Sequence, residues 1–111
     1  MATRQRAAAA FDRSFYPEGG PRQLAAIYAS GSRAEALTAL TAPTLVIHGR
    51  DDTLIPPTGG QRTAELIPAA SLLLLADMGH DLPAPLEATI LGAVIAHARL
   101  AELADAELVA A

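Results

Sequence analysis

The sequence predicts an α/β fold, in which a βαβ unit with two parallel strands is flanked by helices and preceded by a helical segment. Two short apolar runs, residues 44–47 and 72–75, are typical of strands buried on both faces of a parallel sheet. A segment with helical character lies between them, and a strand–helix–strand order makes the two strands parallel. With 111 residues, we expect a single domain, 1–111, with one core.

Composition narrows the classes of function. The chain is 51% hydrophobic but only 4% aromatic, so its core must consist mainly of Ala, Leu, Ile and Val. A net charge of −4 without a basic cluster argues against a nucleic-acid partner. The absence of cysteine excludes a disulfide, a thiolate nucleophile and a cysteine-type zinc site. The first residues lack the apolar core of a signal peptide, and no apolar run reaches the ~20 residues of a membrane span, so we expect a cytoplasmic protein without a membrane partner.

The first 41 residues form the helical segment. A run of four alanines favours a helix over 2–12. The spacing of apolar residues predicts a second helix over 22–30, which Gly31 ends. A short third helix is expected over 33–40, before Pro43.

The remainder, 42–111, contains the strands. After the first strand, Thr58-Gly-Gly-Gln61 has the form of a capping box and predicts a helix that begins there and ends at Pro68. The second strand, 72–75, is followed by a final helix over 84–103 with Pro85 in its first turn. The apolar stripe of this helix is expected to lie on the sheet. Its members are Ile90, Leu91, Val94, Ile95, Ala98 and Ala101.

Two polar loops follow the strands: the acid loop, residues 49–56, and the histidine loop, residues 77–83. Both emerge at the carboxyl ends of adjacent parallel strands, where ligands and catalytic groups of open α/β sheets collect. The two loops would therefore place a carboxylate and an imidazole at the same end of the sheet. A carboxylate and an imidazole are two of the three groups of a Ser-His-Asp hydrolase. The third group is absent from the 111 residues, which contain no Gly-x-Ser-x-Gly elbow.

These loops resemble the C-terminal part of the α/β-hydrolase family. Pro43-Thr-Leu-Val-Ile-His-Gly49, with Asp52 and Ile55-Pro56, is similar to the family's acid strand and loop, and Gly79-His-Asp-Leu-Pro83 to its histidine loop. Residues 11–17 and 22–26 resemble the end of the cap region in small esterases of the polyketide methylesterase type. The resemblance covers essentially the whole chain.

The resemblance implies a partial α/β-hydrolase fold, with residues 1–41 as the cap end and 42–111 as the acid strand, histidine strand and final helix. It implies a serine hydrolase that acts on small-molecule carboxylic esters without a cofactor. Asp52 would accept the Nδ1–H of His80, and His80 would act as general base and then general acid. Because the family's nucleophile and oxyanion turn have no counterpart here, we expect the chain alone to be inactive.

Other polar residues compete for these roles. Asp51 is the alternative acid, and we expect it to point away or to cap the turn. His48 is interpreted as structural, holding the acid loop by a hydrogen bond, and His97 as without a functional role. A metal site built from His48, Asp51, Asp52 and His80 is chemically conceivable, but no pair has the spacing of a metal-binding helix, and none is expected. Four serines lack the setting of a nucleophile: Ser14, Ser30, Ser32 and Ser71.

A second hypothesis is not enzymatic. Two strands with unpaired edges are not stable alone, and the strand at 44–48 would offer an open edge to another chain. The chain would then be a non-catalytic α/β fragment that acts as a homo-oligomer or an interaction module. A homo-oligomer is expected on the same grounds.

Overall fold

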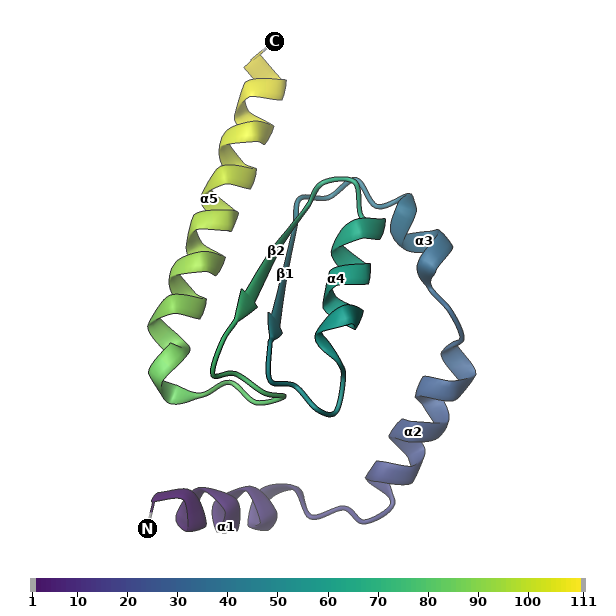
Figure 1. Ribbon diagram of the computed structural model, residues 1–111, viewed down its shortest axis with the longest axis vertical. Coiled ribbons are helices and arrows are strands. Elements are labelled where there is room, and N and C mark those ends of the chain that lie inside the picture. The colour runs from purple at the N-terminus through teal and green to yellow at the C-terminus, as the bar shows by residue number, and fades with distance from the viewer. Residues whose placement is uncertain (1, 111) are drawn as a thin grey trace. The chain divides into compact units, whose positions relative to one another are not determined.

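The computed structural model describes residues 2–110. The chain forms two compact units, Met1–Arg33 and Ala34–Ala111, and each is described by itself. Figure 1 labels their elements. The predicted domain division, with a helical segment 1–41 and a strand region 42–111, stays a prediction. Among the described residues, none of the helices combines the length and apolar character that a membrane span requires.

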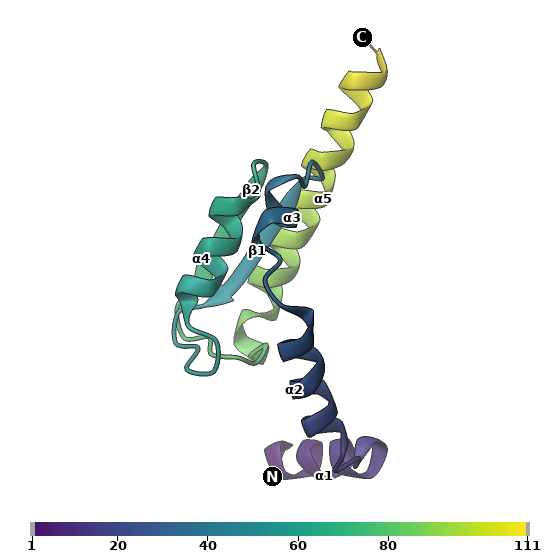
Figure 2. The same ribbon diagram turned by 90° about the vertical axis from the view of Figure 1, so that its right-hand side faces the viewer.

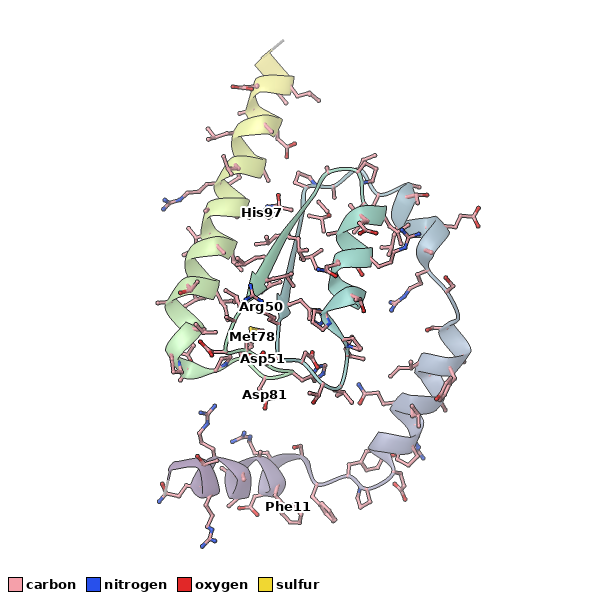
Figure 3. All side chains as sticks on the ribbon, in the orientation of Figure 1. Phe11, Arg50, Asp51, Met78, Asp81 and His97 are labelled. Carbon is pink, nitrogen blue, oxygen red and sulfur yellow. The ribbon has the colours of Figure 1, made fainter. Side chains whose placement is uncertain are left out.

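The first unit consists of two helices, α1 (Ala2–Ser14) and α2 (Gly19–Ser30). Helix α2 begins three residues before the predicted start at residue 22, because Pro21 is tolerated in the first turn of a helix. It ends at Gly31, whose φ of 62° is a left-handed conformation open to glycine. Large apolar side chains of this unit remain exposed, among them Phe11, labelled in Figure 3.

The second unit carries the strands. Its elements are α3 (Ala34–Thr38), β1 (Thr44–Gly49), α4 (Pro57–Leu66), β2 (Ala70–Leu75), the 3₁₀ turn η1 (Ala84–Leu86) and α5 (Glu87–Ala110). The strands β1 and β2 are parallel, with a register that runs from Thr44 opposite Ala70 to Gly49 opposite Leu75. Mixed α/β content with two parallel strands is as predicted. Helix α4 contacts both strands, and Figures 1 and 2 place α5 on the side of the strands away from α4.

The helix α4 does not use the predicted capping box. It begins at Pro57, and its N-cap residue is Pro56, which makes no side-chain capping bond. Thr58 therefore lies inside the helix. A proline at the first helical position has the required φ and has no N–H to leave unpaired, so the helix begins without a capping hydroxyl.

Burial of the strands and of the last helix differs from expectation. All of β1 except Gly49 is only half-buried, and Leu72 of β2 is exposed. The helix α5 extends beyond the predicted end at 103, and Leu91, Val94 and Ile95 of the expected apolar stripe are exposed. Its half-buried positions are Ile90, Ala93, His97 and Ala101. A sheet of two strands is too narrow to cover a broad helix face, so a narrower face is covered.

Most of the buried residues that the structure describes gather near the two polar loops, with Ile67 at the end of α4 as the exception. Gly49 and Leu75, the last residues of their strands, are buried, as are Asp52 and Met78 in the loops that follow. Gly60 in the second turn of α4 is also buried. Polar loops are normally the exposed part of a small α/β unit. Here the best-packed region includes the two loops.

Candidate active site

The two loops interlock at the carboxyl end of the sheet. The N–H of Arg50 donates to the carbonyl oxygen of Leu75 (2.8 Å), and the N–H of Asp51 donates to that of Met78 (3.0 Å). A Cβ atom at Gly49 would overlap the backbone of Met78 and Gly79, so only glycine permits this approach. Figure 3 shows Asp51 and Met78 side by side at this edge.

Asp52 is the buried charged residue of the acid loop, and the residue as a whole is 8% exposed. Its Oδ1 accepts hydrogen bonds from the N–H groups of Leu54 and Ile55, both at 2.9 Å. These bonds curl the loop back onto its own carboxylate, as short Asp side chains do in turns. The Asp52 carboxylate is therefore oriented by its own loop, independently of the histidine loop.

The second carboxylate oxygen faces the histidine loop. Asp52 Oδ2 lies 2.9 Å from Nδ1 of His80. Burial by itself raises the pKa of Asp52, but the hydrogen bonds from His80, Ile55 and Leu54 and the charge of protonated His80 outweigh it. The pKa of this carboxyl group is therefore below its ordinary value, and the group is ionised at neutral pH.

The ionised carboxylate determines the tautomer of His80. An ionised carboxylate can only accept, so the 2.9 Å contact requires the proton to be on Nδ1 of the imidazole. In neutral His80 the lone pair is then on Nε2. The side chain is 56% exposed, against 5% for Asp52, so this nitrogen is accessible to a reacting group. The arrangement can accept a proton at Nε2 and balance the resulting charge at Nδ1.

His48 holds the acid loop, as the sequence predicted. Its Nε2 lies 2.9 Å from the carbonyl oxygen of Ile55 and must donate, because a carbonyl only accepts. The same nitrogen is 3.5 Å from Asp52 Oδ2. Gly60 packs against the other side of the ring, where a Cβ atom would come within 2.7 Å of Nδ1. The ring therefore links β1, the acid loop and α4.

Asp51 has a different partner from Asp52. Its Oδ2 accepts a hydrogen bond of 3.0 Å from the N–H of Asp77, which begins the histidine loop. Asp77 has a φ of 59°, a left-handed conformation that is unusual for a residue other than glycine. Asp77 was not among the residues predicted from the sequence, whose only signal at this position is the general tolerance of aspartate for the left-handed conformation.

A shallow pocket of about 180 Å³ lies at the pair. It is lined by Ile47, His48, Gly49, Asp52, Met78, Gly79 and His80. The predicted candidates outside it include His97, which is half-buried on α5. Ser14 and Ser30 donate to carbonyl groups of their own helices. Within residues 2–110, no three or more His, Asp or Glu side chains are grouped so as to hold a metal ion.

The sequence is similar to two curated methylesterases. It is 34% identical over 70 residues to "Rhodomycin D methylesterase DauP" of Streptomyces sp. (strain C5), and equally to "Rhodomycin D methylesterase DnrP" of Streptomyces peucetius. In both cases the match covers 63% of this chain and 24% of the relative, so the matched region spans about a quarter of those proteins. No protein-family model matches the chain.

Proposed function

We propose that this chain supplies the acid and the base of a serine-type ester hydrolase with an α/β-hydrolase fold. In this proposal, Asp52 is the acid and His80 the general base. The observation that carries it is the 2.9 Å contact between Asp52 Oδ2 and His80 Nδ1, at the carboxyl ends of two parallel strands. The similarity to two methylesterases supports an ester substrate, and a methyl ester in particular.

The proposed chemistry moves one proton twice. Nε2 of His80 takes the proton of a serine hydroxyl as its oxygen attacks the ester carbonyl, and Asp52 stabilises the imidazolium that forms. The imidazolium then gives the proton to the departing alkoxide, which leaves as the alcohol. Water repeats the sequence on the acyl-enzyme and releases the carboxylic acid. The 111 residues contain no Gly-x-Ser-x-Gly elbow, so the proposal places the nucleophile and the oxyanion donors on polypeptide outside them.

A chimeric methylesterase tests the proposal. The segment of DnrP that this chain matches is replaced by residues 1–111 of this chain, which include Asp52 and His80, and methyl ester hydrolysis is measured. Asp52→Asn should lower kcat by about 10⁴-fold, because the wrong tautomer of His80 is then favoured. His80→Ala should be at least as damaging.

The matched control is Asp81→Asn, which removes the exposed carboxylate next to His80 in sequence and should leave kcat within about twofold. A folded, active chimera that keeps its activity without His80 or Asp52 would contradict the proposal. So would equal losses with Asp81→Asn and Asp52→Asn.

The chain alone provides a second test. It should hydrolyse an activated ester no faster than its His80→Ala variant does, because it lacks an elbow serine. Turnover that depends on His80, together with a serine labelled by a fluorophosphonate, would instead locate the nucleophile within these residues and contradict that part of the proposal.

A second candidate function is assembly. Within the described residues, β1 and β2 pair only with each other, so each strand has an open edge. Leu91, Val94 and Ile95 of α5 are about half exposed or more. Both features favour association with another copy of the chain. Light scattering at micromolar concentration should then report a dimer or larger species, whereas a cooperatively unfolding monomer would contradict this candidate.

A further inference from the structure

Asp51 makes two hydrogen bonds to the histidine loop, one through its backbone N–H and one through its side chain. Its own N–H donates to the carbonyl oxygen of Met78, and its carboxylate accepts the N–H of Asp77, both at 3.0 Å. Asp51 and Asp77 are 26 positions apart in the sequence. Asp51 therefore links two segments that local structure alone would not bring together.

The turn that Asp51 holds is conformationally costly. Asp77 has a φ of 59°, a region that is unfavourable for a residue with a Cβ atom, although aspartate tolerates it better than most. The conformation reverses the chain directly after β2 and directs the N–H of Asp77 to the Asp51 carboxylate. The next residue, Met78, is 7% exposed and anchors the turn in the packed region.

The position of His80 depends on this turn. His80 follows Met78 by two residues, and its side chain is 56% exposed, so few packing contacts restrain the ring. Asp52, by contrast, is held within its own loop by Leu54 and Ile55. The separation of the two side chains is therefore determined by how the histidine loop is fastened to the acid loop.

We propose that Asp51 is a positioning residue, which holds the Asp77–Met78 turn and thereby keeps Nδ1 of His80 within hydrogen-bond distance of Asp52. The proposal rests on the proposed function for its catalytic meaning. The consecutive aspartates then have separate tasks, because Asp51 orients the loop that carries the base and Asp52 orients the base itself. Asp51 touches neither the substrate nor the reacting atoms in this scheme.

The tautomer of His80 tests the proposal in the 111-residue chain, without an assay of hydrolysis. Nitrogen-15 NMR of the imidazoles at a pH where His80 is neutral shows which ring nitrogen carries the proton. In the unaltered chain, the proton should be on Nδ1. Asp52→Asn gives the reference value of the Nδ1–H population for a His80 without its carboxylate partner. Asp51→Ala should lower the Nδ1–H population of His80 at least about twofold, since the Asp77 N–H loses its acceptor.

Two variants separate positioning from a general loss of structure. Asp51→Asn should restore the tautomer, because its side-chain carbonyl can accept the same N–H. Adding Asp77→Gly to Asp51→Ala should restore it as well, because glycine adopts the turn without strain. Ile67→Val, in a buried residue outside the loops, lowers stability and should leave the tautomer unchanged.

The proposal is overturned if the Nδ1–H population of His80 is the same in Asp51→Ala as in the unaltered chain. It is likewise overturned if Ile67→Val shifts that population as much as Asp51→Ala does. It is also overturned if Asp52→Asn has no effect, because the pair is then not formed. If Asp51→Ala does not fold, hydrogen exchange of the unaltered chain tests the proposal instead. The Asp77 amide should exchange at least about tenfold more slowly than an unprotected amide. An unprotected Asp77 amide contradicts the proposal. Failure of the chimera to hydrolyse esters, with these NMR results intact, would contradict the proposed function alone.

Discussion

The acid loop and the histidine loop meet at one edge of the sheet but are held in opposite ways. The acid loop is held mainly from within, since Asp52 accepts from Leu54 and Ile55 and His48 contacts the carbonyl of Ile55. The histidine loop is held from outside, through hydrogen bonds to Asp51 and Asp52. One loop would keep its shape alone, whereas the other depends on its neighbour.

The side chains at the centre of the two loops differ in the same sense. The Asp52 side chain is 5% exposed, and that of His80 is 56% exposed. An acid that only orients and stabilises an imidazole can be enclosed and saturated with hydrogen bonds. A general base must remain accessible to the group whose proton it takes. The difference in burial therefore matches the difference in the proposed roles.

The largest effect on stability is expected where the loops touch. Gly49→Ala places a Cβ atom against the backbone of Met78 and Gly79, which cannot move aside as a flexible side chain can. The free energy of unfolding should fall by about 3 kcal/mol in urea denaturation. Gly92→Ala, where the added Cβ meets nothing within 4 Å inside α5, should instead raise it by about 1 kcal/mol. Equal effects at the two glycines would show that the loops do not interlock.

Chemical modification should distinguish the histidines. Diethyl pyrocarbonate reacts with unprotonated imidazole nitrogen, and His80 is 56% exposed whereas His48 is 14% exposed. His80 should therefore be modified several-fold faster than His48, as measured by mass spectrometry of the digested protein. Faster modification of His48 would mean that the acid loop opens more readily than the histidine loop.

Acid unfolding should reveal the paired carboxylate. The pKa of Asp52 is lowered in the folded state, so its contribution to stability is complete above the unfolded-state value of about 3.9. That contribution is lost as the pH falls through the lower folded-state value. Asp52→Asn should therefore be less stable than the unaltered chain at pH 6, and the difference should shrink below about pH 4. Asp81→Asn is the control, and the same pH dependence in that variant would contradict the assignment to Asp52.

The smallest effect is expected at the turn that begins the histidine loop. Asp77→Gly relieves a left-handed conformation while keeping the N–H that Asp51 accepts, so the free energy of unfolding should rise by about 0.5 kcal/mol. Chemical denaturation measures the change. Substitution by valine at the same position should have the opposite sign, because a β-branched residue resists this region. A stabilising valine would show that the turn is not left-handed in solution.

Much of the arrangement could be predicted because it depends on local pattern. The apolar runs before each loop are the strands β1 and β2, and strand–helix–strand order makes them parallel, which brings Asp52 and His80 to one end of the sheet. His48 at the end of β1 holds the acid loop, as its place in the sequence indicated. Periodicity and topology were sufficient for these features, because short-range patterns locate the strands and the helix between them, and the parallel order of the strands then determines which loops meet.

Other features were decided only by tertiary structure. Asp77 and Asp51 are far apart in sequence, and neither the left-handed turn nor its acceptor has a local signature. Thr58 matches a capping box, yet the helix begins one residue earlier, at a proline that needs no cap. The half-buried face of α5 includes Ile90 and Ala101 of the predicted stripe but otherwise passes through Ala93 and His97. A sequence pattern specifies which side chains could be buried, whereas the packing of distant segments determines which of them are.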